Sequence, residues 1–170
     1  HFHHTTGLTR FLAGSELVPG LLVVGIENTV RFRDLTPPAR DPDLIELEPA
    51  PGGAERFRSF IAEELIPWVE KNYRTRPYKI LVGHSLGGLF AIDTLLTGPD
   101  LFDAYIAISP SLQWDARRTV ERPKTLLRDE QELNASLFMT VGNEGGALAG
   151  GVKAFAGVLD EQAPAGLQWH

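Results

Sequence analysis

A serine between two glycines is the residue of this sequence best suited to nucleophilic chemistry. Gly83-His84-Ser85-Leu86-Gly87 has the spacing GxSxG, in which the serine occupies a sharp turn between a strand and a helix. A short apolar run precedes it at 80–82, and an apolar segment of helical character follows at 89–96. The order strand, turn, helix lifts a serine hydroxyl above the edge of a sheet. We therefore predict that Ser85 is a nucleophile.

The glycines and the residue after the serine have expected roles at such a turn. The serine adopts a strained backbone conformation, and we expect Gly83 and Gly87 to approach neighbouring backbone too closely for a Cβ. The amide of Leu86 starts the helix and would point to the place where an oxyanion forms. Leu86 is therefore the predicted oxyanion-hole donor. The alternative, a tight glycine turn with an idle serine, is disfavoured by the flanking elements and by the additional Gly88.

A serine hydroxyl needs a base, and a histidine base needs a carboxylate to orient it. For this arrangement the order along the chain is serine, acid, histidine. Glu144 lies between glycines directly after a predicted strand and is the candidate acid. Asp115 is the second candidate, and a solvated loop glutamate is the alternative interpretation of Glu144.

The histidines of the chain do not fit this order well. Three of them precede the serine: His1, His3 and His4. His84 adjoins the serine and should point away from it at the turn. Only His170 follows the acid, on a predicted strand rather than in a loop beyond it. We therefore expect the catalytic base in sequence beyond residue 170. The first histidines lack acidic or thiol partners nearby, so we predict no metal site.

The elements that position these residues alternate between short β-branched runs and longer helical segments. This alternation predicts an α/β fold, with a mostly parallel sheet in a three-layer α/β/α sandwich. Predicted strands cover 21–26, 80–82, 104–109, 136–141 and 167–170, and predicted helices cover 5–17, 54–73, 89–96 and 147–159. We expect Thr5 or Thr6 to cap the first helix and Pro67 to interrupt the second. Residues 29–53, charged and rich in proline, predict a surface loop.

Composition narrows the functional classes. The chain has 170 residues, of which 43% are apolar and 22% are charged, and a net charge of −6. No apolar run approaches the ~20 residues of a membrane span, and no basic face is predicted for nucleic acid. Without cysteine the chain has no disulfide and no thiol nucleophile. No secretory signal is visible, so a cytoplasmic or a periplasmic location remains open, as does the oligomeric state.

Four stretches resemble the Putative esterase (esterase D-like) family of α/β-hydrolases, which includes S-formylglutathione hydrolases and siderophore esterases. The stretches are His1-Phe2 with the following helix, residues 25–37, residues 83–88 and residues 108–115. Members of this family generally have upstream strands, whose last turn is thought to supply a second oxyanion amide, and a histidine loop after the last strands. The resemblance implies one α/β-hydrolase domain over residues 1–170 that lacks both of these parts.

The resemblance also implies a function. It suggests a serine carboxylesterase that cleaves a small-molecule ester through an acyl-enzyme on Ser85 and uses no cofactor. The residues expected to contact the substrate are His84, Asn28, Arg31 and Trp114. An acyltransferase of the same fold and a non-catalytic hydrolase-like binding domain remain alternatives. Because the histidine and one oxyanion donor are missing, we expect the 170-residue chain alone to show little activity.

Two of these substrate contacts have simpler structural alternatives. Arg31 or Arg33 could bind an anionic or catecholate group, because a guanidinium is a planar fork of donors. Arg33 could equally pair with Asp34 and fix the long loop. Trp114 is either an aromatic wall of the cleft or part of the core.

Overall fold

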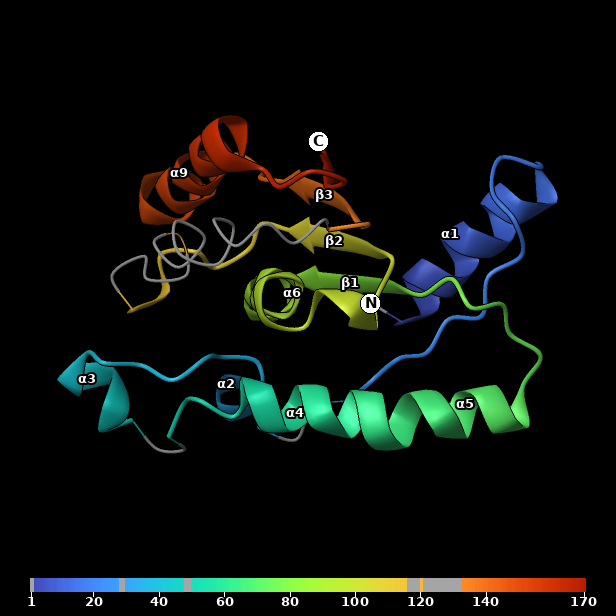
Figure 1. Ribbon diagram of the computed structural model, residues 1–170, viewed down its shortest axis with the longest axis horizontal. Helices are drawn as coiled ribbons and strands as arrows, with labels where there is room; N and C mark the ends of the chain where they lie inside the picture. The colour runs from blue at the N-terminus through green and yellow to red at the C-terminus, as the bar shows by residue number, and fades with distance from the viewer. Residues whose placement is uncertain (1, 28–29, 48–49, 116–119, 121–132) are drawn as a thin grey trace.

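A parallel sheet of four strands forms the centre of the computed structural model (Figure 1), which describes residues 2–27, 30–47, 50–115, 120 and 133–170. The strands are β1 (Ile80–His84), β2 (Ala104–Ile108), β3 (Ser136–Thr140) and β4 (Gln168–Trp169), and they lie side by side in this order. Every neighbouring pair is parallel. Helices follow β1 and β3, so the predicted α/β architecture is confirmed.

The helices of the described residues overlap all four predicted segments, with ends that differ by up to three residues. They are α1 (Phe2–Gly14), α2 (Arg31–Asp34), α3 (Pro42–Ile45), α4 (Ala54–Phe60), η1 (Ile61–Leu65), α5 (Ile66–Asn72), α6 (Leu86–Thr97), η2 (Pro99–Leu101) and α9 (Gly146–Gln162). Because α1 already begins at Phe2, Thr5 and Thr6 lie inside the helix. The prediction that one of them caps it is wrong, and the Thr6 hydroxyl instead donates to the carbonyl of His3.

The helix predicted over 54–73 departs from α-helical geometry just before Pro67 but continues beyond it. The chain passes from α4 through the π-helical turn η1 into α5, whose first turn contains Pro67. Proline has no amide hydrogen and clashes with the carbonyl of the preceding turn, and the wider π turn provides room for it. In Figure 1 the three segments form one continuous rod.

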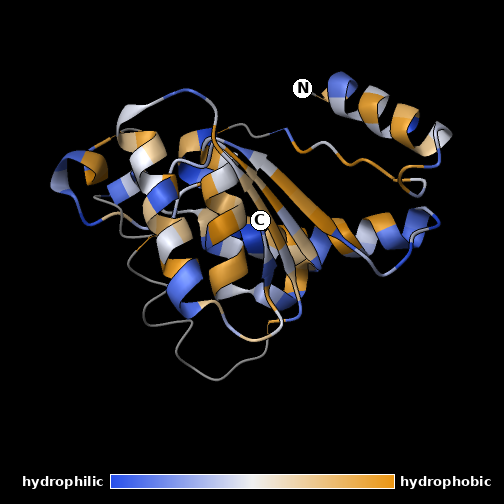
Figure 2. Cartoon of the chain, turned by 90° about the horizontal axis from the view of Figure 1, so that it is seen from above, coloured by the Kyte–Doolittle hydropathy of each residue, from blue (hydrophilic) through white to orange (hydrophobic). Residues whose placement is uncertain are grey.

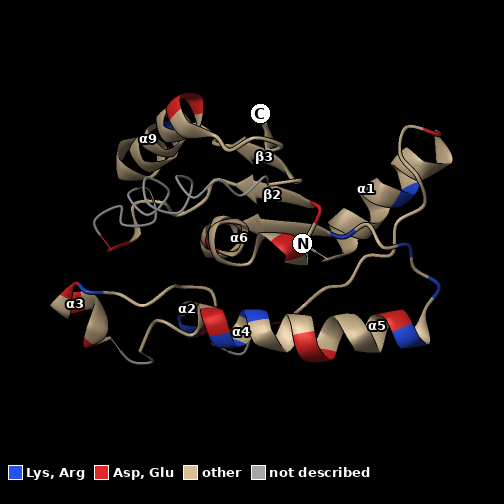
Figure 3. Ribbon diagram, in the orientation of Figure 1, with Lys and Arg blue, Asp and Glu red and all other residues tan. Residues whose placement is uncertain are grey.

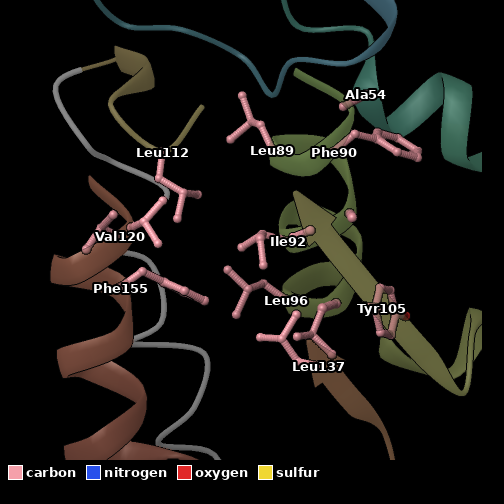
Figure 4. Packing of buried hydrophobic residues seen from close by; sticks show 14 of the residues in the cluster. Ala54, Leu89, Phe90, Ile92, Leu96, Tyr105, Leu112, Val120, Leu137 and Phe155 are labelled. Carbon is pink, nitrogen blue, oxygen red and sulfur yellow. The ribbon is translucent and has the colours of Figure 1, made fainter. Parts of the chain in front are cut away.

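One face of the sheet carries the core. α6 packs against β1 and β2, and Phe155 of α9 points toward α6 (Figure 4). Tyr105, Leu137 and Phe155 are at most 1% exposed. α4 covers the outer side of α6, where Arg58 forms a 3.1 Å ion pair with the buried Asp93. This packing fixes the direction in which α6 leaves the sheet.

The opposite face of the sheet is apolar and exposed. The strand register places Ile80, Val82, Ile108 and Phe138 on this face, and they are 37–51% exposed. α1 stands apart from the other helices in Figure 2 and buries none of its residues. Charges of both signs are interleaved along α4 and α5, whereas the strands carry few (Figure 3). No helix of the described residues has the length and apolar character to cross a membrane.

Residues 21–26 form no strand, so that prediction is wrong. Their large apolar side chains are 38–50% exposed: Leu21, Leu22, Val24 and Ile26. A strand exists only when a neighbouring strand pairs with its backbone amides and carbonyls, and no described strand lies beside this segment. This segment has the apolar composition of a buried strand, but no described strand pairs with it.

The loop predicted over 29–53 contains the two short helices α2 and α3 and is closed by Thr36. This fully buried residue donates its hydroxyl to the carbonyl of Phe32 at 2.7 Å and accepts the amide of Gly52 at 3.2 Å. The amide of Ala54 donates to its carbonyl at 3.1 Å. Thr36 thus joins both ends of the loop to the start of α4, which accounts for a threonine at this position.

Candidate active site

Ser85 lies at the turn from β1 into α6 with φ 58° and ψ −116°. L-residues that have a side chain rarely adopt this backbone conformation, so the turn is strained and must be held by its surroundings. The Ser85 amide donates to the Ile108 carbonyl at 3.0 Å, and the Ser85 carbonyl accepts the Ser111 amide at 3.1 Å. Both bonds join the turn to the chain that leaves β2. The structure therefore stabilises a strained serine at the carboxyl end of the central strands.

The steric demand on the glycines differs in part from the prediction. A Cβ on Gly83 would collide with the carbonyl of Gly87, as expected. At Gly87 itself nothing lies within 4 Å of a Cβ, so the predicted close approach there is wrong. The second crowded position is Gly88, where a Cβ would lie 2.9 Å from the Cα of Pro110. α6 therefore approaches the chain after β2 at Gly88, one residue beyond the GxSxG motif.

The amide of Leu86 lies next to the serine at the first position of α6. An amide at this position has no acceptor within its own helix and carries the positive end of the helix dipole. These properties suit an oxyanion donor. The role of Leu86 stays a prediction.

Glu144 lies between β3 and α9, and its carboxylate is held by a residue that the sequence did not single out. The Ser109 hydroxyl donates to Oε1 of Glu144 at 2.5 Å. This bond is the largest cause that lowers the pKa of Glu144, followed by its own amide, with smaller contributions from the Gly142 amide and the charge of His84. The carboxylate is therefore ionised at neutral pH, as the support of a histidine base requires.

A second serine of the same loop reaches the nucleophile. The Oγ atoms of Ser111 and Ser85 are 3.2 Å apart, and either hydroxyl can be the donor. Ser109 and Ser111 belong to a stretch that carried the family resemblance, but no chemical role was predicted for them. Apart from that resemblance, the sequence feature that marks them is their position on either side of Pro110.

Asp115, the second candidate acid, is 5% exposed and binds the long loop instead. Its carboxylate accepts the amide of Arg40 at 3.1 Å and the amide of Asp41 at 3.0 Å. A carboxylate occupied in this way is suited to anchor the loop. The geometry favours Glu144 as the acid.

The predicted substrate contacts differ in their exposure. Arg31 is exposed on α2, and the neighbouring Arg33 pairs with Asp34 at 2.7 Å. Trp114 is 8% exposed and packs edge-to-face on Phe32 with ring centroids 5.1 Å apart, which favours the core alternative. Asn28 lies outside the described residues.

Two histidines of the described residues adjoin the sheet: His84 ends β1 and His170 directly follows β4. His84 lies at the end of β1 on the exposed face, close enough for its charge to act on Glu144. The amide of His170 donates to Leu137 at 3.0 Å and its carbonyl accepts from Met139 at 2.9 Å, so its backbone belongs to the sheet. Among the described residues, the Ser85 hydroxyl hydrogen bonds to Ser111 and to no histidine.

One family model and several named esterases are similar to this chain. Residues 9–149 match the family model described as Putative esterase. The ferri-bacillibactin esterase BesA of Bacillus subtilis is 40% identical over 58% of this chain and 38% of its own length. The siderophore triacetylfusarinine C esterase of Aspergillus fumigatus is 34% identical over 75% of this chain and 46% of its own length. The chain therefore spans less than half the length of these relatives.

A solved structure is similar to this chain in its fold. The IroE-like serine hydrolase from Shewanella oneidensis is 32% identical and superimposes with a TM-score of 0.85. The match covers 99% of this chain and 58% of that chain. The arrangement of strands and helices described above is thus shared with a serine hydrolase.

Alanine at Gly88 should destabilise the protein, because its Cβ would lie against the backbone of Pro110. We expect a loss of about 1–3 kcal/mol in the free energy of unfolding, the usual cost of overpacking. Gly87→Ala is the matched control, since it adds the same atom to the same helix in open space and should be neutral or slightly stabilising. Urea denaturation of both variants measures the difference. Equal stabilities of the two variants would contradict the close packing of Gly88 against Pro110.

Proposed function

Because the chain belongs to the Putative esterase family and has the α/β-hydrolase fold, we propose that it provides the nucleophile, the acid and one oxyanion donor of a serine carboxylesterase. The observation that carries this proposal is the strained Ser85 at the turn into α6, with Glu144 fixed on the loop after β3. Such strain costs stability and persists where a function requires it.

The proposed reaction proceeds through an acyl-enzyme. Ser85 Oγ attacks the ester carbonyl carbon while a histidine removes its proton, and the carbonyl oxygen becomes an oxyanion facing the Leu86 amide. The intermediate collapses, the alcohol leaves with the proton from the histidine, and water then hydrolyses the acyl group by the same steps. Glu144 orients the imidazole and stabilises its charged form.

The substrate that we propose is a small-molecule carboxylic ester of the siderophore type. One of the two relatives is named a ferri-bacillibactin esterase, and the other is named a siderophore triacetylfusarinine C esterase. Their names favour water over an alcohol as the acyl acceptor, and catalysis over simple binding. Arg31 and His84 are exposed, and they are the residues that we propose for contact with the substrate.

Ser85→Ala tests the nucleophile in the full-length gene product that carries these residues. We expect kcat for a p-nitrophenyl ester to fall at least about a thousandfold. The melting temperature should not change, because within the described residues the hydroxyl forms one hydrogen bond, with Ser111. Steady-state kinetics and thermal unfolding measure the two effects. Turnover above a few per cent of the wild-type rate would show that Ser85 is not the nucleophile.

Glu144→Gln and Asp115→Asn distinguish the two carboxylates. The first should lower kcat by roughly two to four orders of magnitude with little change in KM, since it removes the charge that supports the histidine. The second should mainly lower the melting temperature, because Asp115 anchors the loop at Arg40 and Asp41. A larger loss of kcat for Asp115→Asn would identify Asp115 as the acid.

A further inference from the structure

We propose that Ser109 is a positioning residue, which holds the Glu144 carboxylate in the orientation that supports the catalytic base. This inference rests on the proposed function, because it assigns Ser109 a part in the same site. The relevant contact is the 2.5 Å hydrogen bond from the Ser109 hydroxyl to Oε1 of Glu144.

The donor of this bond is fixed, whereas its acceptor is exposed. Ser109 is 5% exposed, and its amide donates to the carbonyl of Thr140 at 2.7 Å, which attaches it to the end of β3. Glu144 is exposed on a loop of glycines. A free glutamate in such a place loses rotamer entropy when it is ordered. Because the buried Ser109 hydroxyl donates to Oε1 of Glu144, it restricts the rotamers of this side chain and fixes the orientation of the carboxylate.

The backbone around the pair is consistent with this role. Ser109 has φ 41°, a conformation that L side chains rarely adopt and that serves here to direct the residue toward the acid loop. A Cβ on Gly142 would lie 2.9 Å from Oε2 of Glu144, so the carboxylate folds back over a residue without a side chain. An ionised carboxylate has about four acceptor positions. The Ser109 hydroxyl and the amides of Glu144 and Gly142 use three of them, which leaves about one for an imidazole N–H.

The same short segment also reaches the nucleophile. Ser111 lies 3.2 Å from the Ser85 hydroxyl, and Pro110, between the two serines, packs against Gly88 of α6. One rigid Ser-Pro-Ser segment thus sets the position of the acid on one side and contacts the nucleophile on the other. Ser111 provides a comparison within this segment, because it contacts Ser85 and not Glu144.

The test is a double-mutant cycle in the full-length gene product, with Ser109→Ala and Ser109→Gly measured alone and with Glu144→Ala. Glycine removes the hydroxyl and also suits the positive φ, so it separates the lost bond from backbone strain. We expect Ser109→Ala and Ser109→Gly, each measured alone, to lower kcat about tenfold, as for a hydrogen bond to a charged group, with KM within about twofold. When Glu144 is already alanine, removing the Ser109 hydroxyl should have no further effect. Ser111→Ala should give the same fold-loss with and without Glu144.

The outcomes separate this inference from the proposed function. Unchanged kcat in both Ser109 variants, or an undiminished loss in the Glu144→Ala protein, would overturn the positioning role. Failure of both variants to fold would overturn it as well, since it would show that the hydroxyl serves stability. Ser85→Ala, measured in the same series, tests the proposed function independently: if that variant stays active, the esterase mechanism is wrong whatever Ser109 does.

Discussion

The strained turn at Ser85 is the constraint on which the rest of the site depends. The turn is possible only where Gly83 leaves room for the carbonyl of Gly87 and where Gly88 lets α6 approach Pro110. The hydrogen bonds from the turn to the chain after β2 compensate for the unfavourable conformation. They also fix the distance between the nucleophile and that chain. The same contacts that hold the strain therefore bring the serines of residues 109–111 to the site.

The parallel sheet then determines which residues can meet. In a parallel sheet the carboxyl ends of all strands lie at one edge, and ligand sites form there. β1 ends at the nucleophile, β2 at the Ser-Pro-Ser segment, and β3 at the loop with Glu144. Their register is continuous from β1 to β3. Residues far apart in the sequence therefore converge at one edge, although β2 lies between β1 and β3.

The sequence was sufficient for local elements and for the motif of the nucleophile. β1 and α6 were predicted because their apolar runs and the GxSxG spacing depend on neighbours in the sequence. Glu144 could be predicted because position along the chain implies position along the sheet edge. Its role as the acid, like that of Leu86 as the oxyanion donor, stays a prediction.

Other features depend on contacts between distant segments, and the sequence could not show them. Residues 21–26 have the composition of a strand but no partner among the described strands. The crowding at Gly88 instead of Gly87 depends on the position of Pro110. The burial of Trp114 against Phe32 depends on how the long loop folds back. The hydrogen bond between Ser109 and Glu144 likewise joins two loops that only the sheet brings together.

The central claim is that the turn presents Ser85 as an activated nucleophile. Labelling the full-length gene product with a fluorophosphonate and locating the adduct by peptide mass spectrometry test it most directly. The account predicts one adduct, on Ser85, whose formation abolishes ester hydrolysis. An adduct on Ser109 or Ser111 instead, or ester hydrolysis that continues after Ser85 is fully labelled, would contradict it.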